Sequence, residues 1–163
     1  APPPVLIPGI PTLAALAETV PDEVNALAKE FWPGAVTLVV QARESLVWDL
    51  GETRGTVALR MPDDRVALNL LADTGPLAVS SANISGQPAA LTCAEAQEML
   101  GDRISVYLDA GPRGEGAADD AATASTIVDA TSLELPEGRL RILRSGAVPD
   151  DEIARVVGAE RIA

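Results

Sequence analysis

The sequence predicts an α/β fold built on a mixed β-sheet with flanking helices. Strand and helix patterns alternate along the chain, and Pro or Gly separates most of them. The 163 residues are 47% hydrophobic, which is enough for one domain with a real core and too short for two comfortable ones. We therefore expect a single domain over residues 1–163.

Seven short apolar segments are expected to be strands, because each is rich in apolar or β-branched residues and is bounded by turn residues. They span residues 5–7, 35–41, 56–61, 76–80, 104–108, 125–129 and 140–143. Pro62 ends the third, since proline cannot donate to a strand ladder. The run before Ser80 is unbroken by polar residues, which predicts a strand buried on both faces.

Five helices are expected between these strands. They span residues 11–18, 21–31, 64–73, 92–100 and 150–157. A proline in the first turn opens the first two, and Pro33 with the glycine after it ends the second. Asp63 or Asp64 caps the third, and Thr92 with Glu95 has the spacing of a capping box. The apolar side of the third helix is expected to hold Val66, Leu68, Leu70 and Leu71.

Composition excludes several kinds of chemistry. The chain has no histidine, which removes Ser-His-Asp and Cys-His nucleophiles and imidazole bases. The single cysteine, Cys93, cannot form an internal disulfide and is expected to be a small buried hydrophobe. The formal charge of −12 argues against a broad nucleic-acid surface. Lys29 is the only lysine, so the cations are mostly arginines, which suit bidentate binding of carboxylate or phosphate; GC-rich coding explains the same ratio.

Targeting signals are not evident in the sequence. Apolar runs stop well short of the roughly 18 residues that a membrane helix needs, and the start lacks the basic segment of a signal peptide. The sequence therefore predicts a cytoplasmic protein without a membrane span. Residues 111–123 have no periodicity and predict a mobile loop, in which Asp119 and Asp120 are interpreted as solvated charge and not as a metal site.

Arg60 is a candidate for anion binding. It ends the apolar strand at 56–61, and ligands gather at the carboxyl ends of strands in open α/β sheets. Its guanidinium could hold a carboxylate by two parallel hydrogen bonds. The alternative is an ion pair with Asp63 or Asp64 in the helix that follows.

The segment Ser80-Ser81-Ala82-Asn83-Ile84-Ser85-Gly86 is a second candidate. Its small side chains let a ligand approach the backbone, and Ser81 and Asn83 add donors and acceptors. The alternative is an ordinary turn, which Ser and Asn also favour.

Two further segments carry polar groups at strand ends. Ser125 and Thr126 begin one expected strand, and Arg144 follows the other. With Arg60 and the Ser/Asn segment, they could surround one polar pocket.

Five motifs in fixed order resemble the YrdC-like family. They are Phe31-Trp32-Pro33-Gly34-Ala35-Val36-Thr37-Leu38, Thr56-Val57-Ala58-Leu59-Arg60-Met61-Pro62, the Ser80 to Gly86 segment, Ser125-Thr126-Ile127-Val128-Asp129 and Ile142-Leu143-Arg144-Ser145-Gly146. The resemblance implies a YrdC-like twisted mixed sheet. It also implies the activity of the family's bacterial members, L-threonylcarbamoyladenylate synthase. That enzyme forms threonylcarbamoyl-AMP and pyrophosphate from L-threonine, bicarbonate and ATP, for a partner complex that modifies adenosine in tRNA.

The resemblance also implies roles for single residues. Arg60, Ser81 and Ser125 would hold L-threonine, with Thr126 as the alternative to Ser125. ATP would be contacted by the residues Thr56, Asn83 and Arg144. The Trp-Pro-Gly element is interpreted as structural. ATP is the implied nucleotide substrate, Mg²⁺ is expected to accompany it, and no protein residue is assigned to a metal.

The sequence departs from the family ahead of its first strand. The family's Pro-Thr-Asp-Thr-type strand and Lys-x-Arg segment do not occur in the chain. We therefore expect this chain by itself to be inactive or weakly active, and robust pyrophosphate release by it would contradict that expectation. Three alternatives stay open: a YrdC-like module that binds tRNA or double-stranded RNA weakly, an inactive paralogue, and a carbamoyl-transferring domain of the hydrogenase-maturation kind.

Overall fold

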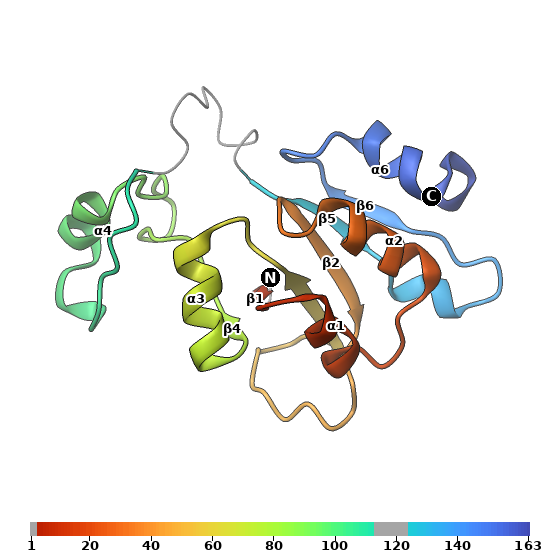
Figure 1. Cartoon of the computed structure of the whole chain (residues 1–163), viewed down its shortest axis with the longest axis horizontal. Coiled ribbons are helices and arrows are strands. Elements are labelled where there is room, and N and C mark those ends of the chain that lie inside the picture. The colour runs from red at the N-terminus through yellow and green to blue at the C-terminus, as the bar shows by residue number, and fades with distance from the viewer. Residues whose placement is uncertain (1–2, 113–123) are drawn as a thin grey trace. The chain divides into compact units, whose positions relative to one another are not determined.

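The structure is a computed structural model that describes residues 3–112 and 124–163 (Figure 1). The chain divides into two compact units, and we describe each by itself. The first unit consists of residues 1–79 and 120–163, and the second of residues 80–119.

The first unit contains a six-stranded mixed sheet in the order β4-β1-β3-β2-β5-β6. The strands are β1 (Val5–Leu6), β2 (Val36–Gln41), β3 (Thr56–Arg60), β4 (Leu77–Ala78), β5 (Thr126–Asp129) and β6 (Arg141–Arg144). The β1–β3 and β2–β5 pairs are parallel, and the other pairs are antiparallel. The predicted α/β class with a mixed sheet and flanking helices is confirmed.

Helices α1 (Ile10–Leu16), α2 (Asp22–Phe31), α3 (Arg65–Thr74) and α6 (Asp150–Val157) belong to the first unit, and α4 (Cys93–Leu100) belongs to the second. The Asp64 carboxylate caps α3 by accepting the amide of Ala67 at 2.7 Å. Thr92 and Glu95 form both bonds of the predicted capping box of α4. These local start signals were therefore sufficient to place both helix starts.

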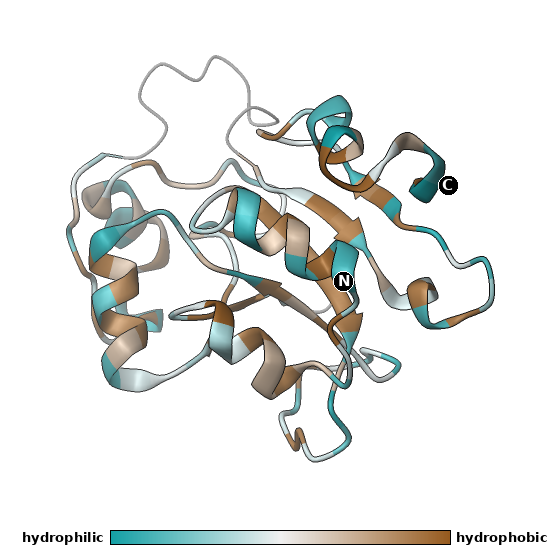
Figure 2. Cartoon of the chain, turned by 45° about the vertical axis from the view of Figure 1, so that its right-hand side comes forward, coloured by the Kyte–Doolittle hydropathy of each residue, from teal (hydrophilic) through white to brown (hydrophobic). Residues whose placement is uncertain are grey.

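The core of the first unit lies against one face of the sheet. Side chains alternate along a strand, so Val36, Leu38 and Val40 of β2 point to this face and are buried. Helices α1, α2 and α6 supply Leu13, Leu27 and other apolar side chains to the same cluster. Figure 2 shows the hydrophobic colouring of the central strands and the hydrophilic residues along α6.

The opposite face of the sheet, which we call the second face, is formed by the other alternate positions. Thr37 and Val39 of β2 lie on it, with Ala58 of β3 and Ile127 of β5 as their neighbours in the ladder. Val39, Ala58 and Ile127 are only partly buried. This face therefore has an apolar floor that the core helices do not cover.

Two sequence predictions about strands and one about the apolar side of a helix were wrong. The run at 76–80 forms only the two-residue strand β4, which lies at the sheet edge with Ala78 exposed, so it is not buried on both faces. Residues 104–108 form no strand, and Val106 is 68% exposed. Of the expected apolar side of α3, Leu71 is buried, but Val66 and Leu70 are exposed.

The loop expected at 111–123 and the question of a membrane span can be addressed only for the described residues. Most of the loop expected at 111–123, including Asp119 and Asp120, lies outside the described residues. In the described ranges, every helix is too short or too polar to cross a lipid bilayer.

Candidate functional site

Three of the residues singled out from the sequence meet at one end of the second face. Arg60 is the last residue of β3, Arg144 is the last residue of β6, and Ser125 directly precedes β5. The β3–β2 and β5–β6 pairs are antiparallel and the β2–β5 pair is parallel. These pairings bring the three positions to the same end of the strands. The site is therefore produced by the topology and not by closeness in sequence.

Arg60 is a partly buried guanidinium whose charge is balanced by no carboxylate among residues 3–112 and 124–163. Its Nε donates to the carbonyl of Gly34 at 2.9 Å. Burial, and secondly repulsion by Arg144, lowers the pKa of Arg60. Within the described ranges neither arginine forms an ion pair, so Arg60 does not make the alternative contact with Asp63 or Asp64. Two neighbouring guanidiniums without a counter-ion favour binding of an anion.

Ser125 links Arg144 to the floor of the sheet. Arg144 donates to the Ser125 carbonyl through Nε at 3.0 Å and Nη2 at 2.8 Å, and Nη2 also reaches the Ser125 Oγ at 3.1 Å. The Oγ lies 2.8 Å from the hydroxyl of Thr37, which is 2% exposed. These bonds fix the position of a guanidinium that is otherwise exposed.

Thr126, the alternative to Ser125, has its hydroxyl engaged inside the protein. Its Oγ1 donates to the carbonyl of Val148 at 2.6 Å and accepts the amide of Gly146 at 3.0 Å. The residue is fully buried. Its hydroxyl fastens the turn after β6 to β5.

Two glycines let the backbone pass close to this site. A Cβ on Gly34 would lie 2.3 Å from the carbonyl oxygen of Phe31, and a Cβ on Gly146 would lie 2.4 Å from that of Ala124. Both distances are far below a normal contact, so any larger residue would displace the chain. The Trp-Pro-Gly element thus has the structural role interpreted from the sequence, and its Gly34 carbonyl also holds Arg60.

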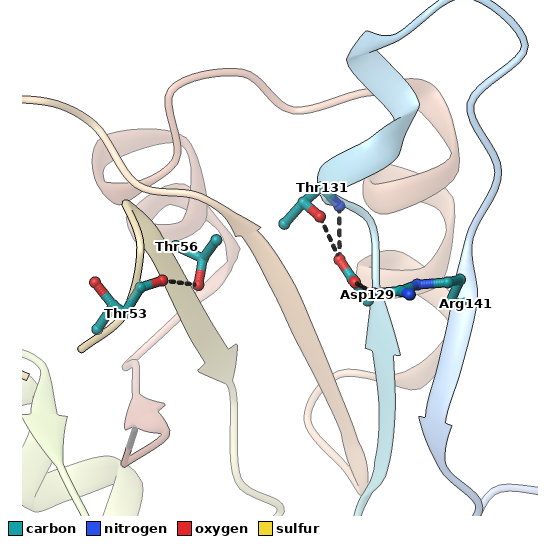
Figure 3. Close-up of polar contacts among 5 residues, drawn as sticks. All are labelled: Thr53, Thr56, Asp129, Thr131 and Arg141. Atoms are coloured by element: carbon teal, nitrogen blue, oxygen red, sulfur yellow. Dashed lines mark hydrogen bonds and ion pairs between the residues drawn. The ribbon is translucent and has the colours of Figure 1, made fainter. Parts of the chain in front are cut away.

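Thr56 lies on the same face of β3 as Arg60 but at the other end of the strand. The two are four positions apart, which corresponds to about 13 Å at roughly 3.3 Å per residue. The Thr56 hydroxyl donates to the carbonyl of Thr53 at 2.7 Å (Figure 3). A cavity of about 150 Å³ opens here, with Val39, Ala58 and Ile127 in its walls. Thr56 is therefore not part of the group formed by Arg60, Arg144 and Ser125.

A separate polar cluster closes the Thr56 end of the sheet. The Asp129 carboxylate accepts three hydrogen bonds (Figure 3). Thr131 donates two of them, from its amide at 2.9 Å and from its hydroxyl at 2.6 Å, and Nη2 of Arg141 donates the third at 2.7 Å. Burial alone would raise the pKa of Asp129, but the bonds from Arg141 and Thr131 outweigh it and lower the pKa. The carboxylate is already satisfied by the protein, which indicates a structural role.

Ser81 and Asn83 belong to the second unit. Ser81 is exposed and lines a cavity of about 250 Å³ within that unit, together with Cys93, which is half-buried and not buried as expected. The Asn83 amide nitrogen donates to the carbonyls of Ile84 at 3.1 Å and Gln87 at 2.9 Å, as a turn-forming Asn does. Its Oδ1 is buried and accepts no hydrogen bond from the described residues, so an unused acceptor remains.

A metal site built from protein carboxylates or thiols is not found among residues 3–112 and 124–163. No three Asp, Glu or Cys side chains there are grouped closely enough to hold an ion. The described residues therefore do not supply a metal cage of carboxylates or thiols.

Thr37 is the site residue that sequence reasoning missed. In the sequence it stands only as one residue of the motif Phe31 to Leu38. A signal was present, because Thr37 is the single polar residue in the apolar run from Ala35 to Val40. A lone hydroxyl in such a run indicates a specific hydrogen-bond partner, which proves to be Ser125.

The comparisons with known proteins agree with this fold. A sequence model of the Sua5/YciO/YrdC family, described as telomere recombination, matches residues 1–146. The chain therefore belongs to this family. A Mycobacterium leprae protein, provisionally named threonylcarbamoyl-AMP synthase, is 49% identical over 154 residues, which are 94% of this chain and 65% of that protein.

Proteins outside the mycobacteria are also similar. The threonylcarbamoyl-AMP synthase of Bacillus subtilis is 33% identical over 94% of this chain and 42% of its own length. The crystal structure of Pyrococcus abyssi Sua5 complexed with L-threonine superimposes with a TM-score of 0.82 at 34% identity, over 99% of this chain and 45% of that chain. The chain thus spans about two thirds of its mycobacterial relative and less than half of these two.

Proposed function

We propose that the chain contributes the substrate site of a threonylcarbamoyl-AMP synthase, which makes threonylcarbamoyl-AMP and pyrophosphate from L-threonine, bicarbonate and ATP. The observation that supports this most is the pair Arg60 and Arg144, which lie beside Ser125 and form no ion pair with any described residue, in a chain of net charge −12. Relatives named for this activity support the same reaction.

In this proposal Arg60 and Ser125 bind the carboxylate of L-threonine. A guanidinium and a hydroxyl both donate to carboxylate oxygens, and Arg60 is already oriented by the Gly34 carbonyl. The amine of threonine then adds to bicarbonate with loss of water, which forms an N-carboxylate. Binding of the amino acid by its carboxylate leaves the amine free to react.

The second step transfers the adenylyl group. A carbamate oxygen attacks the α-phosphorus of ATP, the bond to the β-phosphate oxygen breaks, and pyrophosphate leaves. Arg144 would stabilise the negative charge that develops on the phosphates, and alignment supplies much of the remaining rate. This chemistry needs no side-chain nucleophile, which suits a chain without histidine.

The nucleotide is proposed to lie along the second face toward Thr56. The cavity at that end has apolar walls at Val39, Ala58 and Ile127, which favour a nucleobase more than a phosphate. Mg²⁺ is proposed to arrive on the phosphates of ATP. In the second unit, Ser81 is proposed to contact L-threonine and Asn83 to contact ATP. A separate variant of each residue is needed to test its contact with that ligand.

Isothermal titration with L-threonine and with ATP tests the proposal, because it does not depend on turnover by this chain. We expect both ligands to bind, Arg60→Met to weaken L-threonine binding, and Arg144→Met to weaken ATP binding. L-Serine and carbamoyl phosphate are the comparison ligands. Tight carbamoyl phosphate binding without L-threonine binding would favour the carbamoyl-transferring alternative, and tRNA binding with a steep salt dependence would favour the RNA-binding one.

A further inference from the structure

The hydroxyl of Thr37 lies beneath the proposed threonine site and has no assigned role. It is 2% exposed and contacts the Oγ of Ser125 at 2.8 Å. It points to the second face, whereas its neighbours Val36 and Leu38 point into the core. The hydroxyl therefore serves the site side of the sheet and not the core.

Hydrogen-bond accounting at Ser125 gives Thr37 a defined consequence. A hydroxyl has two acceptor positions and one proton to donate. One acceptor position of the Ser125 Oγ takes Nη2 of Arg144 at 3.1 Å. If Thr37 donates, the second acceptor position is also filled, and the Ser125 proton is left to bond outward. If Ser125 donates to Thr37 instead, its proton is used inside the protein.

An anionic ligand selects between these two arrangements. A carboxylate has acceptors only, so it binds the arrangement in which the Ser125 proton points outward. An ammonium or another pure donor would need a free lone pair on Ser125, and that arrangement leaves none. Arg60 and Arg144 favour the same polarity, because both are donors only.

We propose that Thr37 is a positioning residue that donates to the Ser125 Oγ and thereby makes Ser125 a hydrogen-bond donor for the carboxylate of the amino-acid substrate. This inference rests on the proposed function, because it takes the ligand at Ser125 to be L-threonine. Thr37 does not touch the substrate and acts only through Ser125. It contributes to selecting a carboxylate at this position.

A double-mutant cycle between Thr37 and Ser125 tests the inference, with L-threonine affinity measured by isothermal titration on the full chain. Thr37→Val removes the hydroxyl at nearly constant shape and is expected to weaken binding about fivefold, in the range of one hydrogen bond. Thr37→Ser keeps the hydroxyl and is expected to stay within about twofold of wild type. Ser125→Ala is expected to weaken binding about tenfold, and Thr37→Val in that background should add no further loss.

Thr131→Val is the matched control. Its hydroxyl also donates a partly buried hydrogen bond, to Asp129 at 2.6 Å at the far end of the sheet. It should lower the melting temperature without changing L-threonine affinity. Thr37→Ala, which also removes the hydroxyl, replaces Thr37→Val if the valine variant does not fold.

The outcomes separate the inference from the proposed function. Wild-type affinity in the Thr37→Val variant, or an equal loss in the wild-type and Ser125→Ala backgrounds, would overturn the inference and leave the proposed function in place. Failure of the wild-type chain to bind L-threonine would instead overturn the proposed function, and the role of Thr37 with it. The pattern of fivefold loss, rescue by serine and no effect without Ser125 would support both.

Discussion

Replacing Arg60 with methionine separates a functional arginine from a structural one. Methionine keeps most of the length and apolar stem of arginine but removes its charge. The only side-chain hydrogen bond that Arg60 forms within the described ranges is the one to the Gly34 carbonyl at 2.9 Å. A hydrogen bond from a charged donor contributes about 1.5–3 kcal/mol.

The loss of that bond is offset by two unfavourable effects that disappear with the charge. Arg60 is desolvated by burial and repelled by Arg144, and both effects lower its pKa. We therefore expect Arg60→Met to change the free energy of unfolding by about 1 kcal/mol or less, whereas removal of an arginine from a buried ion pair costs about 3–5 kcal/mol. For a chain of this size, the change expected for Arg60→Met shifts the melting temperature by at most about 4 °C. The loss of a buried ion pair would shift it by about 6–20 °C.

Thermal denaturation with and without L-threonine provides the assay, because Arg60 is proposed to bind its carboxylate. A ligand present at 100 times its dissociation constant stabilises the folded chain by about 2.7 kcal/mol, which raises the wild-type melting temperature by about 5–11 °C. Arg60→Met should lose most of this increase. Arg65→Met, at an exposed arginine on α3, controls for the loss of one positive charge.

Two results would refute this reasoning about Arg60. A fall of more than about 6 °C in the melting temperature of ligand-free Arg60→Met would show that the arginine is structural. An undiminished increase with L-threonine in this variant would show that the amino acid binds elsewhere.

Three further predictions concern positions around the site and in the second unit. Asp129→Asn should lower the free energy of unfolding by about 1–3 kcal/mol at pH 7. Because the folded pKa of Asp129 is lowered, this stabilisation is complete above the unfolded pKa of about 3.9 and is lost as the pH falls through the folded pKa. Urea titrations of the two proteins should therefore converge as the pH falls through that lower range. Thr92→Ala should cost about 1 kcal/mol and speed hydrogen exchange at the Glu95 amide; unchanged exchange would contradict the capping box. Gly146→Ala should weaken L-threonine binding, because its Cβ would come within 2.6 Å of the Ser125 carbonyl carbon; unchanged affinity would show that the turn adapts.

The sequence was most informative where a local signal determines the structure. The Asp64 cap, the Thr92 capping box and the strand expected at 35–41 each depend on residues within a few positions, and the structure confirms them. Arg60 was found for a similar reason, since an arginine that ends an apolar strand is conspicuous.

Sequence reasoning failed where burial depends on distant partners. Residues 76–80 and 104–108 have the composition of strands, but composition does not say whether a neighbouring strand is available. The first segment pairs with β1 over two residues at the sheet edge, and the second pairs with nothing in the described part of its unit. Val66 and Leu70 were misplaced for the same reason, because their helical spacing predicts a buried side that the first unit leaves exposed.

The candidate site shows both limits together. The presence of Arg60, Ser125 and Arg144 could be predicted, because each stands at a strand end. Their relation could not, because it depends on strand order: β3 and β6 are not neighbours, and β2 and β5 lie between them. Thr37 belongs to β2, and its hydroxyl bonds Ser125, which directly precedes β5. A residue that the sequence presents as part of an apolar strand therefore stands between the two arginines. If the Thr37→Val cycle proves non-additive with Ser125→Ala, the sheet itself orients the donors of the site.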